Sequence, residues 1–233
     1  RKKNRIYKKR YTLIMKTDKN LGKKVNEYLI KKGVETPIQK NEYFCNEDLQ
    51  KQNIEKHFTQ IMYTLGLDLS DDSLIDTPKR VAKMYVNEIF YGLDYNKFPK
   101  ATTVDNKMKY DEMVLVNDIN VQSNCEHHFV VIDGLASFAY IPKDKVLGLS
   151  KINRIVEFFS KRPQIQERLT EQIFFALSYI LDTEDCAISI NATHYCVKSR
   201  GIQDVNSYTV TSKLGGRFKK EPAVRNEFLN LIK

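Results

Sequence analysis

The chain has 233 residues, 42% hydrophobic and 29% charged, a composition typical of a globular protein with a sizeable core. No apolar stretch reaches the roughly 18 residues that a membrane-spanning helix needs. The basic first residues lack the apolar segment of a secretory signal. These features predict one or two domains in the cytoplasm and argue against a membrane-embedded protein.

The net charge of +9 is concentrated at the N-terminus. Residues 1–25 hold eleven Lys and Arg against one acid, Asp18, whereas the remainder holds 27 basic and 28 acidic residues. A run such as RKKNRIYKKR is typical of a solvated arm that binds polyanions weakly. We therefore expect a basic, flexible arm over residues 1–44, with at most one short helix around Val25 to Lys32. No specific nucleic-acid or membrane partner is expected.

A helical region is predicted over residues 45–110. From Asn46 to a stop at Gly66, apolar residues recur at three- and four-residue intervals, as on one face of a helix. These residues are Ile54, Phe58, Ile61, Met62 and Leu65. A second helix is predicted to begin at Thr77–Pro78, where a capping residue precedes a proline, and to run to Gly92.

The remaining residues, 111–233, are predicted to form an α+β domain. Four segments rich in Val, Ile, Tyr and Thr indicate strands. They are Met113 to Gln122, Leu135 to Pro142, Cys186 to Lys198 and Ser207 to Leu214. Helices are expected at Leu149 to Lys161, at Gln164 to Leu181 and, near the C-terminus, at Ala223 to Ile232. This order predicts an antiparallel four-stranded sheet with two long helices on one face, preceded by the N-terminal helices.

Two cysteine–histidine motifs indicate a metal site. The run Cys125-Glu126-His127-His128 brings a thiol and imidazoles together in one turn, which is a recurring half of a zinc site. His194 and Cys196 are two residues apart in a predicted strand and would project to the same side. If Cys125, His128 and Cys196 converge, three protein ligands leave the fourth position of a tetrahedral zinc ion for water, as in catalytic sites.

Spacing alone leaves three interpretations of these residues open. The first is the open, catalytic zinc site. The second is a closed structural site with His127, His194 or Cys186 as the fourth ligand, and the third has no metal, with the cysteines simply buried. The spare histidines favour the open site, because imidazole exchanges protons near neutral pH beside a bound water. Four cysteines without a secretory signal also favour metal or catalytic use over disulfides.

Two further sets of polar residues lie at the starts of the two long predicted helices. Ser150, Lys151 and Arg154 can gather on the first turn of one helix, where the helix dipole and unpaired N–H groups suit a polyphosphate, and Arg200 is another cation for the same anion. The alternative is an ordinary solvated helix face. On the next helix, Gln166-Glu167 combines an amide and a carboxylate that can read the edge of a base. Here the alternative is an acid that only complements the helix dipole.

The order of these motifs resembles the GTP cyclohydrolase I family, which feeds folate and biopterin synthesis. The segments that carry the resemblance are DTPKRVAKMY, CEHHF, AYIPKDKVLGLSKINRIVEFFSKRPQIQERLT, HYCVKSRG and TSKLGG. The similarity covers about residues 45–233 and leaves the arm before them outside. Several long motifs in one order make the resemblance specific.

The resemblance implies a role for each matching position. The implied zinc ligands are Cys125, His128 and Cys196, and the implied acid/base residues are His127 and His194. The implied triphosphate contacts are Ser150, Lys151, Arg154 and Arg200, with Arg80 reaching the site of a neighbouring subunit. The residues implied in guanine recognition are Gln166 and Glu167.

The resemblance also implies the reaction and the assembly. The expected reaction is zinc-dependent opening of the GTP imidazole ring, with release of formate and rearrangement to 7,8-dihydroneopterin triphosphate. The expected assembly is a toroidal homodecamer under allosteric control, in which the sheets join into a barrel of the tunnelling-fold type and the active sites lie between subunits. A nucleic-acid-binding zinc module and a paralogue without turnover are the alternatives. The near-neutral body and the complete set of ligand and proton-transfer residues argue against them.

Overall fold

The structure is a computed structural model, and it describes residues 16–233. The RKKNRIYKKR run of the expected arm lies outside the described residues. None of the helices within residues 16–233 is both long and apolar enough to cross a bilayer.

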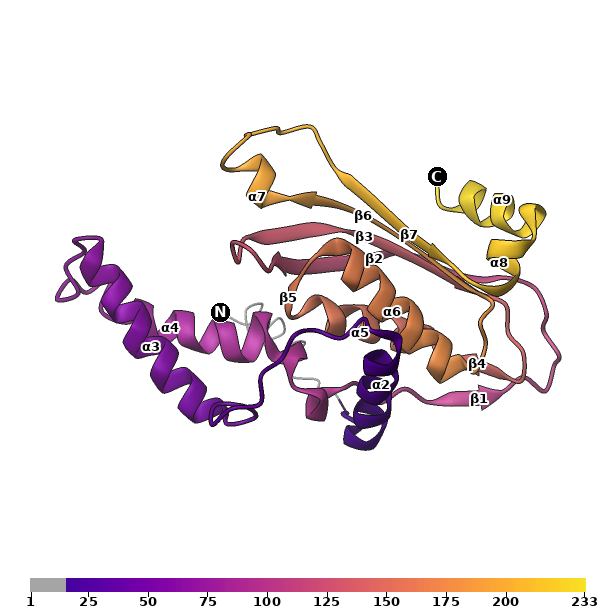
Figure 1. Cartoon of the computed structure of the whole chain (residues 1–233), viewed down its shortest axis with the longest axis horizontal. Coiled ribbons are helices and arrows are strands. Elements are labelled where there is room, and N and C mark those ends of the chain that lie inside the picture. Colours follow the sequence, from indigo (N-terminus) through magenta and orange to yellow (C-terminus); the bar gives the residue numbers. More distant parts are fainter. Residues whose placement is uncertain (1–15) are drawn as a thin grey trace, which may run out of the picture.

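A five-stranded sheet in the order β5-β2-β3-β6-β7 organises the fold (Figure 1). Its four longer strands pair with one another in antiparallel fashion: β2 (Val114–Cys125), β3 (Val131–Tyr140), β6 (Cys186–His194) and β7 (Thr209–Leu214). The fifth strand, β5 (Pro163–Gln164), pairs parallel with the end of β2. A separate two-stranded sheet joins β1 (Thr103–Asp105) to β4 (Lys145–Leu147). The predicted count of four strands therefore needs correction, because two- and three-residue strands are too short to give a periodic signal.

Buried and exposed residues alternate along the strands, which explains how the sheet covers its core. In β2, Ile119 and Val121 are buried, while the intervening Asn120 is exposed. Side chains two residues apart point to the same face of a strand, so one face of the sheet is apolar. The helices α5 (Leu149–Ser160) and α6 (Gln166–Leu181) lie against this face (Figure 1).

The α6 helix fills the core with residues four apart. Leu169, Ile173 and Leu177 are all fully buried, as expected for one face of a helix with 3.6 residues per turn. Near one end of the sheet, α8 (Gly216–Lys220) and α9 (Pro222–Leu231) form a smaller core around Phe218 and Phe228. The α8 helix was not predicted from the sequence.

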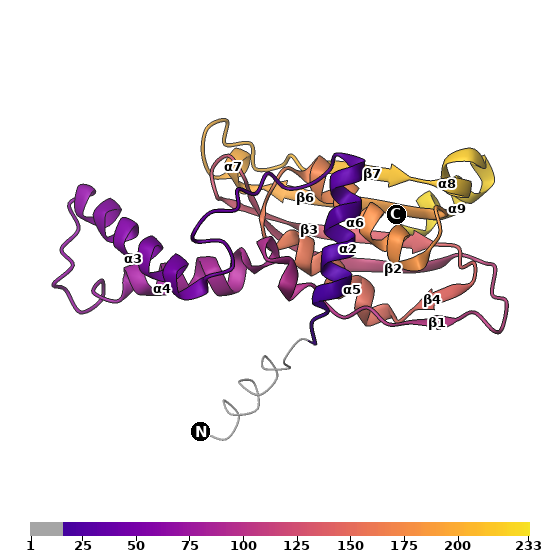
Figure 2. The same cartoon turned by 60° about the horizontal axis from the view of Figure 1, so that its bottom comes forward.

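The N-terminal segment is a part of the folded body from residue 19 onward. The α2 helix (Lys19–Lys32) starts at Asp18, whose carboxylate accepts a hydrogen bond from the Leu21 amide at 2.9 Å. It lies across α6 (Figure 2), and its Val25 and Leu29 are fully buried in the main core. The helix is thus longer than expected, and the expectation of a flexible arm fails for this segment.

The next two helices extend away from the body (Figure 1). The α3 helix (Glu47–Thr64) begins after Asn46, whose side chain caps the Leu49 amide at 3.2 Å. The α4 helix (Thr77–Met84) carries the expected proline in its first turn and continues as a π-helical turn, η1 (Tyr85–Ile89). Within α3 only Met62 is buried. Ile54 and Phe58 are half-buried and Ile61 is exposed, so part of the apolar face that predicted this helix is left uncovered by the described residues.

Two short 3₁₀ helices then lead back to the core, η2 (Tyr91–Leu93) and η3 (Tyr95–Lys97). They are held by Arg162, which is fully buried and donates hydrogen bonds to Gly92 O, to Tyr95 Oη at 3.3 Å and to Thr36 Oγ1 at 3.2 Å. Three aromatic rings surround its guanidinium carbon at 4.8 to 5.1 Å. One side chain thus joins the residues after α2, the η2–η3 segment and the end of α5.

Gly92→Ala tests this close packing. A Cβ atom at position 92 would lie 2.1 Å from Phe158 O and 2.7 Å from Lys161 O, and both are backbone atoms that cannot turn aside. We expect the substitution to destabilise the protein by about 2 to 3 kcal/mol, which corresponds to roughly 4 to 12 °C in melting temperature. Gly148→Ala is the matched control, because its Cβ would meet nothing closer than 3.8 Å. Equal melting temperatures for the two variants would contradict the packing.

Candidate metal centre and active site

The topology brings the two cysteine–histidine motifs to the same end of the sheet. The β2 strand ends at Cys125, and the hairpin turn that follows leads into β3, where Val131 lies opposite Asn124. The β6 strand runs antiparallel to β3 and ends at His194, opposite Ile132. Both motifs therefore flank the start of β3, although about 70 residues of sequence separate them.

Three ligand atoms converge at this end of the sheet. The ligand atoms of Cys125, His128 and Cys196 lie within 4.8 Å of one another, and no fourth cysteine, histidine or carboxylate of the described residues joins the group. Cys186 begins β6 and thus lies at the opposite end of that strand. The arrangement fits the open-site interpretation better than the closed one. A metal ion could be held here.

The chemistry of the donor set also fits a divalent ion. Burial and the neighbouring Cys125 thiol raise the pKa of the Cys196 thiol, while Arg200 opposes them. The guanidinium of Arg200 donates to Nε2 of His128 at 2.8 Å, which places a positive charge beside an imidazole nitrogen. Two adjacent thiols are unfavourable as thiolates until a cation offsets their charge. Thiolate and imidazole together suit borderline ions such as zinc.

Metal binding should therefore release protons. Because the pKa of Cys196 is raised above its ordinary value, its thiol is protonated at neutral pH and must lose a proton to bind a metal. We expect the apparent affinity for zinc to rise with pH, by up to about tenfold per pH unit for each proton released. Titration of the metal-free protein with zinc in a weakly buffered indicator solution measures the protons directly. Binding without any proton release would contradict a thiol ligand set.

One local prediction is wrong. The sequence predicts a strand through Lys198, with His194 and Cys196 on the same face, but β6 ends at His194 and Tyr195–Lys198 forms the short helix α7. Tyr and Val favour strands, yet the pairing of β6 with β3 stops at Ile132, one residue from the start of β3, so β3 offers no run of partners beyond His194. Cys196 reaches the site from a helical turn.

The two histidines expected to exchange protons lie next to the ligand set. Nδ1 of His127 is 3.6 Å from Sγ of Cys125. His194 is partly buried, and its Nε2 lies 2.8 Å from Oε1 of Gln166. Burial lowers the pKa of His194 below its ordinary value, and the negative charge of the Glu167 carboxylate opposes this shift only in part.

Gln166, expected to contact guanine, lies inside the protein. The residue is only 1% exposed, and its amide group is hydrogen-bonded to β6 and β7 as well as to His194. The amide nitrogen and oxygen of Gln166 thus both form hydrogen bonds inside the protein. Glu167, by contrast, is exposed, and its carboxylate forms no hydrogen bond or ion pair with the residues that the structure describes.

A contact that the sequence motifs do not indicate ties the hairpin turn to α6. Glu126 forms an ion pair with Arg168, and its Oε1 lies 4.0 Å from Nε2 of His127. The amide of Glu126 also donates to Gln164 O at 3.0 Å. The only available indication was charge, because an acid and a base sit within the CEHH and QER motifs. Nothing in the spacing says that they pair.

Most of the residues expected to bind phosphate lie away from the metal ligands in the same chain. Ser150 and Lys151 are at the start of α5, whereas the end of α5 leads into β5, which pairs with Cys125. Twelve helical residues span about 18 Å, so α5 holds these side chains far from the metal ligands. Arg154 is one turn closer, and Arg80 on α4 pairs with Asp76 at 3.3 Å. Of the expected phosphate contacts, only Arg200 reaches the metal ligands within one chain.

An open cleft of about 630 Å³ borders the site. Glu126, His127, Phe129 and Pro163 line one side of it. The opposite side is formed by residues of the 36–44 segment, which the sequence analysis had placed in the arm. The volume is in the range of small-molecule sites, about 300 to 1,000 Å³. No pattern in the sequence pointed to this segment.

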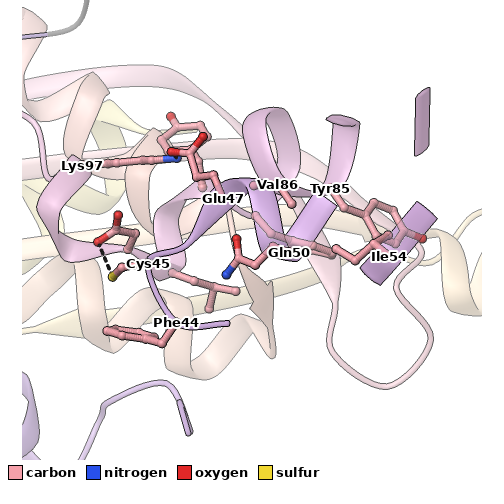
Figure 3. A pocket seen from close by; sticks show the side chains of 12 residues that line it. Phe44, Cys45, Glu47, Gln50, Ile54, Tyr85, Val86 and Lys97 are labelled. Atoms are coloured by element: carbon pink, nitrogen blue, oxygen red, sulfur yellow. Dashed lines mark hydrogen bonds and ion pairs between the residues drawn. The ribbon is translucent and has the colours of Figure 1, made fainter. Parts of the chain in front are cut away.

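Figure 3 shows a second, smaller hollow between the start of α3 and the η1–η3 segment. Its volume is about 130 Å³, and it contains none of the predicted site residues. Sγ of Cys45 donates to Asp94 at 3.3 Å, and Lys97 pairs with Glu47 at 2.7 Å. Desolvation and Asp94 raise the pKa of this thiol, so it stays protonated. The hollow is too small for a nucleotide and is not the active site.

Comparisons with known proteins agree with this site. The sequence profile described as GTP cyclohydrolase I matches residues 54–233. The GTP cyclohydrolase 1 of Yersinia enterocolitica is 59% identical over 209 residues, which is 90% of this chain and 94% of that protein. The GTP cyclohydrolase 1 of Aeromonas salmonicida is 62% identical over 201 residues, covering 86% of this chain and 91% of that protein. The chain belongs to the GTP cyclohydrolase I family.

The similarity to the GTP cyclohydrolase I family starts earlier than the motifs indicated. The motifs place its start near residue 45. The match to the Yersinia protein covers 209 of 233 residues, so it reaches into α2. The similarity includes α2 because this helix is part of the core, where its Val25 and Leu29 are buried. This helix has no polar motif that reveals its role.

Proposed function

We propose that this protein opens the imidazole ring of GTP by hydrolysis, releases formate and forms 7,8-dihydroneopterin triphosphate, the first step of folate or tetrahydrobiopterin synthesis. The observation that carries the proposal is the convergence of Cys125, His128 and Cys196 beside two further histidines. Relatives at 59 to 62% identity are named for a GTP cyclohydrolase activity. The same proposal places the enzyme in a reducing compartment, because thiol ligands must stay reduced.

Zinc is the ion proposed for the three ligands. A zinc ion held by Cys125, His128 and Cys196 would supply Lewis-acid chemistry, which would activate a water for attack on C8 of the guanine. In the proposed reaction His194 accepts a proton from the attacking water and then donates it to a ring nitrogen beside C8 as the ring opens. His127 assists this protonation from the opposite motif. Each histidine can play this part because imidazole gains and loses protons near neutral pH.

Substrate recognition is proposed for the remaining polar residues. The exposed carboxylate of Glu167 can accept two N–H groups from the edge of guanine, a pattern that adenine does not offer. The triphosphate is assigned to a group of cations and one hydroxyl. This group consists of Ser150, Lys151, Arg154 and Arg200, with Arg80 added from a neighbouring subunit. Binding the triphosphate far from C8 orients the base for reaction.

The site is proposed to be shared between subunits. Within one chain the start of α5 is held far from the metal ligands, so the cations there serve a site on another copy. The uncovered apolar face of α3 supports an assembly, since Ile61 is 52% exposed and Leu65 is 71% exposed. The family resemblance suggests a homodecamer whose joined sheets form a barrel.

The direct test measures zinc content together with formate released from GTP. We expect about one zinc ion per chain, in line with a single three-ligand centre, and one formate per pterin formed. Loss of formate release on removal of the metal, with recovery when zinc is added, would support the proposal. Pterin formation that continues in the fully metal-free protein would overturn it.

Mixing two inactive variants tests whether the site is shared. Co-expressed Cys196→Ala and Lys151→Ala chains should recover part of the activity that each variant lacks alone. Recovery is expected because some sites would combine an intact ligand set from one chain with an intact helix start from another. If every chain formed its own complete site, mixing would restore nothing.

A further inference from the structure

The buried amide of Gln166 has a fixed orientation. Its Nε2 lies 3.0 Å from Ile190 O, 3.0 Å from Thr209 O and 3.1 Å from Thr211 Oγ1. The first two partners are backbone carbonyls, which only accept hydrogen bonds. The nitrogen of the amide must therefore face the strands, because the opposite orientation would place two oxygens against the amide oxygen. The two strands β6 and β7 thus decide which way the oxygen points.

A pair of threonines supports the same orientation. Thr170 Oγ1 donates to Gln166 O at 2.8 Å, so its hydrogen is in use. In its 2.7 Å contact with Thr211 Oγ1, the hydrogen must then come from Thr211. Thr211 therefore turns a lone pair toward Gln166 Nε2, whose two hydrogens are shared among this hydroxyl and the two carbonyls. Side chains from α6 and β7 therefore agree on one direction for the whole chain of hydrogen bonds.

The orientation of Gln166 determines where His194 carries its proton. Oε1 of Gln166 lies 2.8 Å from Nε2 of His194, and an amide oxygen can only accept. Nε2 must therefore carry the hydrogen. A neutral imidazole has one N–H and one lone pair, which leaves the lone pair on Nδ1.

We propose that Gln166 is a positioning residue, which holds His194 through Nε2 and leaves Nδ1 as the nitrogen that exchanges protons with the substrate. Gln166 does not read the guanine in this account; Glu167 does so alone. The inference rests on the proposed function, because it assigns roles within that reaction. It changes the expectation drawn from the family resemblance, in which Gln166 contacts the base.

The first test replaces Gln166 by Met, which keeps the length of the side chain and removes its hydrogen bonds. We expect kcat to fall roughly ten- to a hundredfold, the usual effect of removing a residue that orients a reacting histidine. The affinity for a non-hydrolysable GTP analogue and the preference for GTP over inosine triphosphate should stay unchanged. In a His194→Ala background, Gln166→Met should cause no further loss, since it acts only through that histidine.

Gln172→Met is the matched control. Gln172 is also a fully buried glutamine of α6, and its amide donates to Val34 O at 2.8 Å without contacting His194. We expect both variants to lose a similar amount of melting temperature, but only Gln166→Met to lose kcat. A fall in the affinity for the GTP analogue together with lost discrimination against inosine triphosphate, in Gln166→Met alone, would show that Gln166 reads the base and would overturn the proposal.

The second test uses the unaltered protein. Nitrogen NMR of the zinc-loaded enzyme with ring-labelled histidine distinguishes the two neutral forms, and the spectrum of His194→Ala identifies the signals of His194. The expected result is a proton on Nε2; a proton on Nδ1 would overturn the inference even if Gln166→Met fails to fold. If the enzyme released no formate from GTP, the proposed function would fail, whereas this spectrum would still report the state of His194.

Discussion

Replacing Cys196 by Ala is expected to abolish metal binding and formate release together. Cys196 supplies one of only two thiols in the ligand group, and the remaining pair of Cys125 and His128 cannot hold zinc in the geometry of a catalytic site. We expect zinc content to drop to background and turnover to fall by at least about a hundredfold. Metal analysis of the purified protein and a formate assay measure both effects.

Cys45→Ser is the control for this experiment. Cys45 is an exposed thiol near the start of α3 and does not belong to the ligand group, so this variant should keep both zinc and turnover. Added zinc at high concentration should not rescue Cys196→Ala, because the missing ligand is part of the protein. Formate release by a metal-free Cys196→Ala protein would show that the three residues do not form the catalytic centre.

Much of the fold could be predicted from local patterns. The apolar repeat of α6 and the alternation in β2 each follow from burying one face, so their positions are close to those expected. The π-helical turn after α4 and the two-residue strand β5 gave no signal, since they depend on contacts with distant segments. The role of α2 was missed for a related reason. Its basic composition suggested a solvated arm, while two fully buried side chains fix it to the core.

The candidate site was predicted in part. The ligand group could be named from residue type and spacing, and the structure brings Cys125, His128 and Cys196 together. The reasoning that placed Cys196 on a strand was nevertheless wrong, because α7 delivers it.

Local sequence cannot reveal which partners a buried polar side chain forms hydrogen bonds with. Gln166 looked like a base reader because amides commonly bind bases, but the carbonyls that fix its amide come from residues 190 and 209. Those partners lie 24 and 43 residues away in the chain. The distance between the start of α5 and the metal ligands was equally invisible until the topology was known.

Replacing His194 by Ala is expected to separate catalysis from metal binding. His194 ends β6 close to the ligand group without belonging to it, so zinc content should remain at the level of the unaltered enzyme. Turnover should fall by about 10² to 10⁴, the usual contribution of a positioned general acid or base. A variant that kept both zinc and full turnover would remove His194 from the proposed reaction.

His57→Ala supplies the control, because His57 is an exposed histidine of α3 that lies outside the ligand group. It should leave zinc content and turnover unchanged. The comparison has a further consequence for the metal. If His194→Ala also lost its zinc, His194 would act as a fourth ligand, and the closed-site interpretation would return. A site that holds zinc with three ligands and loses turnover without His194 therefore requires a histidine that moves protons beside the ion.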